Sequence, residues 1–189
     1  MSKLLAMMMS QKVEEMPLTV VGYPTITDGV VSGFSSSDYV EKNSFGFVNS
    51  FSGKIRAKID SDTTVYNGLF QFRTGGTGNL FSLENYGPTA IRIYHYDISS
   101  SSNKAEAIYN LSLANKWIDY YFDYNNDTKI LNVYGKENNT TIFTKTYNNT
   151  EVTGTTFRLG LVFADAFNGE IDINNSNMEI DGTKYIFTV

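Results

Sequence analysis

The stretch from Phe167 to Phe187 constrains the fold of this chain more than any other. Its apolar residues alternate with polar ones, as in a strand with one buried face: Phe167, Ile171, Ile173, Met178 and Ile180. The pair Asp181-Gly182 then separates this run from Tyr185-Ile186-Phe187. Asp and Gly tolerate the positive φ angles that a type I′ turn needs, so the stretch predicts strands around a tight turn that close the domain.

Alternation with a period of two continues through most of the chain from Val20 onward. The clearest case is residues 54–60, where Ile55, Ala57 and Ile59 share one face. Similar runs between turn residues predict about a dozen strands at intervals of roughly ten residues, which is typical of a β-sandwich. No strands alternate with helices, which argues against a parallel sheet. A length of 189 residues suits one such domain.

Composition narrows the classes of function. The chain contains 13 Tyr and 13 Phe, which suit pleated, half-buried surfaces. A net charge of −5 without a basic cluster argues against nucleic acid as the main partner. Cysteine is absent, so the fold uses no disulfide and no thiolate chemistry.

Residues 1–16 are the only helix-like stretch. The apolar residues that fall on roughly helical spacing are Leu4, Leu5, Met7, Met8, Met9, Val13 and Met16. Their continuous apolar part is about six residues long, too short for a membrane span or a signal peptide, so no membrane insertion is expected. Two interpretations stay open: a frayed terminus, or a Met-rich arm that anchors in a groove of another subunit. The predicted organisation is an anchoring arm, helical or extended, over residues 1–19 and one domain over residues 20–189.

Three stretches carry a resemblance to a known family: residues 25–39, residues 116–134 and residues 167–182. They are similar to the opening strand, the central strand pair and the closing strands of the concanavalin A-like, laminin-G-like jelly roll. The resemblance implies an all-β fold, an antiparallel β-sandwich of this jelly-roll type. The same sandwich serves lectins, glycosidases and adhesion or decoration modules, so the fold alone does not give the function.

The residue pattern of these motifs also resembles that of virion proteins of tailed bacteriophages, which form head fibres, tail fibres and baseplates. This resemblance implies a non-enzymatic accessory protein on the virion surface that adheres through its β-sandwich. Its expected partners are other virion proteins, reached through the N-terminal arm, and further copies of itself. No heptad repeat is visible, which favours a small capsid- or tail-attached protein over a fibre with a long shaft.

A stand-alone lectin or receptor-binding module is the alternative, with a cell-surface glycan as the partner. The aromatic residues proposed to line the glycan site are Tyr94, Tyr96, Trp117 and Tyr124. Aromatic residues on strands also fill cores and form cross-strand pairs, which is the competing interpretation.

A calcium site is a weaker expectation. Asp123, Asn125 and Asp127 offer oxygen ligands close together, and related lectins bind calcium in such loops. The same three residues suit an ordinary turn. No other cofactor is expected.

Catalysis is not expected, and no catalytic residue is assigned. Residues 170–174, Glu-Ile-Asp-Ile-Asn, resemble the Glu-X-Asp-X-Glu motif of glycosidases with this fold, but Asn174 replaces the last acid and cannot transfer a proton as that acid must. His95 is the only histidine, which excludes a zinc site built from several histidines. A degenerate glycoside hydrolase is the third hypothesis.

Overall fold

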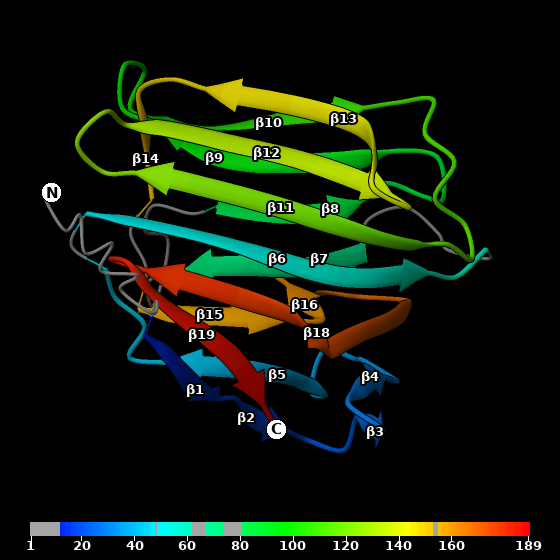
Figure 1. Ribbon diagram of the computed structural model, residues 1–189. Helices are drawn as coiled ribbons and strands as arrows, with labels where there is room; N and C mark the ends of the chain where they lie inside the picture. Colours follow the sequence, from blue (N-terminus) through cyan, green and yellow to red (C-terminus); the bar gives the residue numbers. More distant parts are fainter. Residues whose placement is uncertain (1–11, 48, 62–66, 74–80, 153–154) are drawn as a thin grey trace, which may run out of the picture.

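A computed structural model shows two packed β-sheets (Figure 1). The structure describes residues 12–47, 49–61, 67–73, 81–152 and 155–189. Among them no helix is long and apolar enough to cross a membrane. The predicted turn over residues 74–79 lies outside the described residues.

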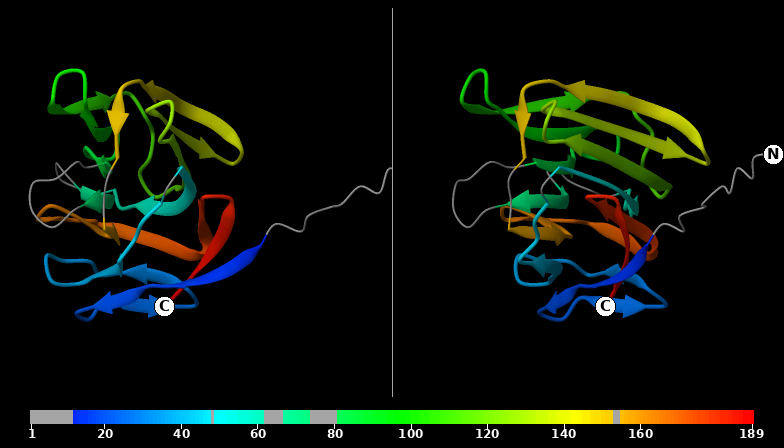
Figure 2. Two further views of the ribbon diagram at one scale, coloured as in Figure 1. Left: turned by 90° about the vertical axis from the view of Figure 1, so that its left-hand side faces the viewer. Right: turned by 60° about the vertical axis from the view of Figure 1, so that its left-hand side comes forward.

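The first sheet has nine strands and lies in front in Figure 1. Its main order is β1 (Val13–Pro17), β19 (Thr183–Thr188), β18 (Gly169–Ile180), β6 (Ser50–Ile59), β11 (Trp117–Asn125), β12 (Ile130–Glu137) and β13 (Thr140–Tyr147). Two short strands, β4 (Val30–Ser32) and β3 (Thr25–Thr27), add to it beside β18. In the side view of Figure 2 the strands at both ends of this sheet lie further out than β6, so its outer face is concave.

The second sheet has eight strands and lies behind the first. Its order is β10 (Ser102–Ile108), β9 (Ile91–Asp97), β8 (Phe81–Asn85), β7 (Asn67–Arg73), β15 (Thr156–Leu159), β5 (Tyr39–Asn43) and β2 (Thr19–Val21), with β14 (Thr150–Glu151) beside β9. A separate two-stranded hairpin, β16 (Leu161–Val162) and β17 (Asp165–Ala166), contacts β7. The all-β, antiparallel sandwich predicted from the sequence is confirmed.

Aromatic rings fill the space between the two sheets. Phe51 of β6 lies 4.6 Å from Phe72 of β7, and Phe122 of β11 lies 4.9 Å from Phe70 of β7, measured between ring centroids. All four side chains are buried. Burial of large aromatic groups is the main stabilising contribution available to a fold without disulfides.

The closing hairpin is confirmed. Ile180 pairs with Thr183, and the two residues between them, Asp181 and Gly182, have φ angles of 47° and 84°. The Asp181 carboxylate also accepts hydrogen bonds from the backbone N–H groups of Asn49 and Ser50, at 2.7 and 2.9 Å. The segment before the turn is one long strand, β18, whose pairing with β6 shifts between Asp172 and Asn177.

From Val13 onward the N-terminal segment is extended, which is one of the two forms expected for the arm. Residues 13–17 form β1, which pairs in parallel with β19, and Met16 is buried against the core while Val13 is exposed. Residues 19–21 form β2 in the other sheet. Residues 13–19 are therefore part of the sandwich, because their backbone completes both sheets. The other predicted anchoring residues lie outside the described residues: Leu4, Leu5, Met7, Met8 and Met9.

Candidate binding site on the concave sheet

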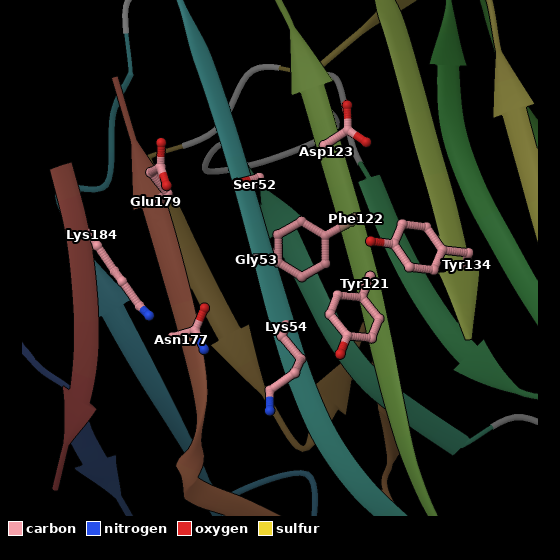
Figure 3. A pocket seen from close by; sticks show the side chains of 10 residues that line it. All are labelled: Ser52, Gly53, Lys54, Tyr121, Phe122, Asp123, Tyr134, Asn177, Glu179 and Lys184. Atoms are coloured by element: carbon pink, nitrogen blue, oxygen red, sulfur yellow. The ribbon is translucent and has the colours of Figure 1, made fainter. Parts of the chain in front are cut away.

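The concave face carries an open hollow of about 400 Å³ near its middle (Figure 3). Strands β6, β11, β12, β18 and β19 line it. Its floor includes Gly53, where a side chain would lie 2.5 Å from the ring of Phe122 beneath it. Gly53 shares the inward face of β6 with Phe51 and Ile55, while its neighbours Ser52 and Lys54 face outward and line the hollow.

Two tyrosines form one wall of the hollow. Tyr121 of β11 and Tyr134 of β12 are directly opposite in the antiparallel register, and their rings stack with centroids 4.7 Å apart and 5° between the planes. The Lys136 ammonium lies 5.3 and 5.6 Å from the two ring centroids. Partial burial, with the Asp119 carboxylate nearby, raises the pKa of Tyr121, so its hydroxyl is neutral and able to donate a hydrogen bond.

Two ammonium groups reach into the hollow from opposite sides. Figure 3 shows Lys54 of β6 and Lys184 of β19 on either side of the Asn177 amide. Neither lysine forms an ion pair with a carboxylate of the described residues. This end of the hollow therefore carries two positive charges without a protein counter-ion among those residues.

Carboxylates lie toward the other end. Figure 3 places Asp123 and Glu179 at the end of the hollow nearer Ser52, away from the two ammonium groups. The Asp123 carboxylate accepts a hydrogen bond of 3.1 Å from the Asn132 amide. The hollow thus presents hydrogen-bond acceptors at one end and charged donors at the other.

The concave surface beside the hollow is a network of paired charges. Arg56 lies 3.0 Å from Asp119 and 3.8 Å from Asp172, while Lys58 lies 2.6 Å from Glu170. The Arg56 and Lys58 cations each lie 5.5 Å from the ring centre of Trp117. The predicted glycan-binding residue Trp117 therefore has its ring covered by two neighbouring side chains.

The other three predicted glycan-binding residues do not lie at the hollow. Tyr124 is buried between the sheets, where its hydroxyl donates a hydrogen bond of 3.1 Å to the Thr150 carbonyl, so it cannot present a ring to a ligand. Tyr94 and Tyr96 stand on β9 of the opposite sheet. Tyr94 contacts Arg92 and Phe163 there. The four residues thus do not form one site, because they belong to the core and to two opposite faces.

The residues considered for calcium serve the β11–β12 hairpin. The Asn125 side-chain oxygen accepts hydrogen bonds from the backbone N–H and the hydroxyl of Thr128, at 2.9 and 3.1 Å. Asp123 is bound by Asn132, and Asp127 is exposed in the turn. Among the described residues no group of three or more acidic or histidine side chains could hold a metal ion. Two of these three side chains, Asn125 and Asp123, already accept hydrogen bonds from the protein, which fits the turn interpretation better than the calcium site.

The glycosidase-like segment lies on β18. Strand β18 lies inside the sheet, between β19 and β6. Glu170 and Asp172 nevertheless face Lys58 and Arg56 as ion-pair partners, and Asn174 donates to the Asp28 carbonyl. These contacts stabilise the sheet.

Sequence reasoning missed Lys54, Tyr134 and Lys184. The available signal was weak, because their proximity depends on cross-strand pairing between segments far apart in the chain. Tyr121 and Tyr134 lie at equivalent outward positions of two strands predicted to be neighbours, so the pairing of these two rings could have been found.

No protein-family model matches the chain, and no curated protein matches it in sequence. Solved structures do match. The binding domain of botulinum neurotoxin serotype D superposes with a TM-score of 0.60 at 14% identity, over 88% of this chain and 43% of that chain. Domains LG4-5 of the mouse laminin α1 chain match with a TM-score of 0.54 at 8% identity, over 86% of this chain and 44% of that chain.

A third match is the CBM40 domain of the Ruminococcus gnavus IT-sialidase, bound to α2,3-sialyllactose. Its TM-score is 0.51 at 15% identity, over 67% of this chain and 74% of that chain. This chain spans less than half the length of the neurotoxin and laminin structures that it matches. Identities this low show a common fold alone: the chain has the laminin-G-like, concanavalin A-like jelly-roll fold.

Proposed function

We propose that this domain is a non-catalytic glycan-binding module whose ligand occupies the hollow on the concave sheet. The observation that carries the proposal is the stacked pair Tyr121–Tyr134 beside a polar hollow of about 400 Å³. A sugar ring has apolar C–H groups on its faces and hydroxyl groups around its edge. Flat aromatic rings suit the faces, and carboxylate, amide and ammonium groups suit the hydroxyls.

Two of the structural neighbours support this kind of function. The CBM40 domain is bound to sialyllactose, and the neurotoxin domain is a binding domain. Glycan binding by this chain is an inference from its own hollow, and the CBM40 structure adds that a sandwich of this fold can hold a glycan.

The non-catalytic part of the proposal rests on the state of the acidic residues. In a retaining or inverting glycosidase two carboxyl groups flank the scissile bond, one of them as the proton donor. Glu170 and Asp172 instead form ion pairs with Lys58 and Arg56. Incubation with reducing-end-labelled oligosaccharides should release no product; hydrolysis that disappears in Glu170→Gln would revive the glycosidase hypothesis.

The first experiment is a glycan array, followed by calorimetry on the best ligand. Tyr121→Ala and Tyr134→Ala should each weaken binding about tenfold, the effect of losing one aromatic contact. The matched control is Tyr23→Ala, because Tyr23 is 95% exposed and lies between β2 and β3, outside the hollow. Binding by wild type that neither hollow variant weakens would contradict this location of the site.

Display on a bacteriophage virion is the more specific proposal, and the resemblance of the sequence motifs supports it. In that setting the module would adhere to a cell-surface glycan while other virion proteins hold it. Mass spectrometry of purified particles from a producing host tests this. Absence of the protein from the particles would contradict the virion proposal and would leave the glycan-binding proposal standing.

A further inference from the structure

We infer that the ligand of the concave hollow is an acidic glycan, with its anionic group held between Lys54 and Lys184. This inference rests on the proposed function, and it names the chemical class of the ligand. Its basis is the contrast between these two lysines and the other cations of the same face.

The other cations of the concave face have partners within the protein. Arg56 and Lys58 form ion pairs with acidic residues on neighbouring strands, and Lys116 lies 3.1 Å from Glu137. Lys136 lies over the rings of Tyr121 and Tyr134. A surface built in this way satisfies its positive charges internally.

Lys54 and Lys184 depart from this pattern. The register places Lys184 directly opposite Glu179, yet the two do not form an ion pair. Lys54 pairs across the sheet with Tyr121 on one side and Asn177 on the other, neither of which is charged. Both ammonium groups therefore keep their donors for a group that enters the hollow.

The arrangement also orients the ligand. Lys54, Lys184 and the Asn177 amide lie at one end, where a carboxylate or sulfate would accept from all three. Asp123 and Glu179 at the other end accept hydrogen bonds from neutral hydroxyls and repel a second anion. One negative group per bound sugar unit fits this polarity better than a uniformly charged polymer does.

The test is an array that carries sialylated, uronate-containing and sulfated oligosaccharides, each beside its counterpart without the anionic group. We expect binding to acidic members and at least about tenfold weaker binding to their neutral counterparts, with the affinity falling as ionic strength rises. Carboxylated and sulfated members distinguish the two sources of the anion.

Lys54→Gln and Lys184→Gln should each weaken binding of the acidic ligand about threefold to fivefold, the upper part of the range of an exposed ion pair, and should leave binding of the neutral counterpart unchanged. The matched control is Lys104→Gln, which removes the same charge from β10 of the opposite sheet. Equal binding of acidic and neutral members, or lysine variants that bind like wild type, would overturn the inference while the proposed function stands. An array on which no oligosaccharide is bound would contradict both this inference and the proposed function.

Discussion

The ring of Tyr121 lies almost parallel to the ring of Tyr134, with 4.7 Å between centroids, at directly opposite positions of β11 and β12. Such a cross-strand pair stabilises a sheet beyond the burial of each ring, by about 0.5–1 kcal/mol. The pair therefore stabilises the protein as well as lining the hollow.

A double-mutant cycle tests this coupling. Urea unfolding of wild type, Tyr121→Ala, Tyr134→Ala and the double variant should give a coupling free energy of about 0.5–1 kcal/mol. Combining Tyr121→Ala with Tyr23→Ala should be additive, because Tyr23 is exposed in a loop outside this sheet. Additivity in both cycles would mean that the stacked geometry contributes nothing to stability.

The closing turn gives a second prediction. Gly182 has a φ of 84° and open space where a side chain would stand, so Gly182→Ala should cost about 1–2 kcal/mol from backbone strain alone. Gly46→Ala is the control, since Gly46 also has open space but no φ in the left-handed region. Thermal unfolding should show a lower midpoint for the first variant and an unchanged one for the second.

The fold could be predicted because its signals are local. Asp181-Gly182 specifies a turn by the φ angles it tolerates, and the alternation of Ile55, Ala57 and Ile59 specifies which face of β6 is buried. Strand β10 shows where such signals end. It begins at Ser102 although residues 102–106 hold only one apolar side chain, Ala105, because an edge strand needs no apolar side chains to form its ladder.

The site was less accessible to sequence reasoning. Trp117 and Tyr124 lie seven positions apart on one strand, so a period of two puts them on opposite faces, and they could not share a ligand. The pattern does not say which sheet a strand joins, and Tyr94 and Tyr96 proved to lie on the other sheet from Trp117. The hollow itself depends on five strands meeting around Gly53, which only the three-dimensional arrangement reveals.

Strand β1 gives a third prediction. Met16 of β1 is 4% exposed, and β1 pairs with β19 at the other end of the chain. Met16→Ala should lower the free energy of unfolding by about 2–5 kcal/mol, whereas Val13→Ala in the same strand should have little effect, since Val13 is 55% exposed. Denaturant unfolding of the two variants measures the difference.

The same strand decides how the predicted anchoring arm is tested. A chain that begins at Leu18 loses β1 and should be less stable than one that begins at Lys12, which keeps every described residue. Oligomerisation should therefore be compared by light scattering between the full chain and the chain from Lys12. Aggregation of the chain from Leu18 would report damage to the sheet and not the loss of an anchor.

The only histidine gives the last prediction. His95 is 6% exposed, its ring lies 4.2 Å from that of Tyr147, and its Nδ1 is 3.4 Å from the Thr150 hydroxyl. Burial lowers the pKa of His95, and the Lys104 ammonium lowers it further. The Asp97 and Glu106 carboxylates raise this pKa and oppose the shift. At pH values between the folded and the unfolded pKa, His95 is therefore neutral in the folded protein and protonated in the unfolded chain.

The sign follows from that difference in proton binding. Stability should fall as pH drops below about 6.5, the value of an unperturbed histidine, with a slope of at most about 1.4 kcal/mol per pH unit, until the pH passes the folded pKa. Asp38 and Asp97, whose pKa values are lowered, titrate below this range. The raised pKa of buried Glu84 acts in the opposite direction, because there the folded state holds the proton more tightly.

Urea unfolding between pH 5 and pH 7.5 should therefore show a flatter or reversed slope in His95→Gln than in wild type. Equal slopes in the two proteins would show that His95 binds protons equally in the folded and unfolded states despite its burial.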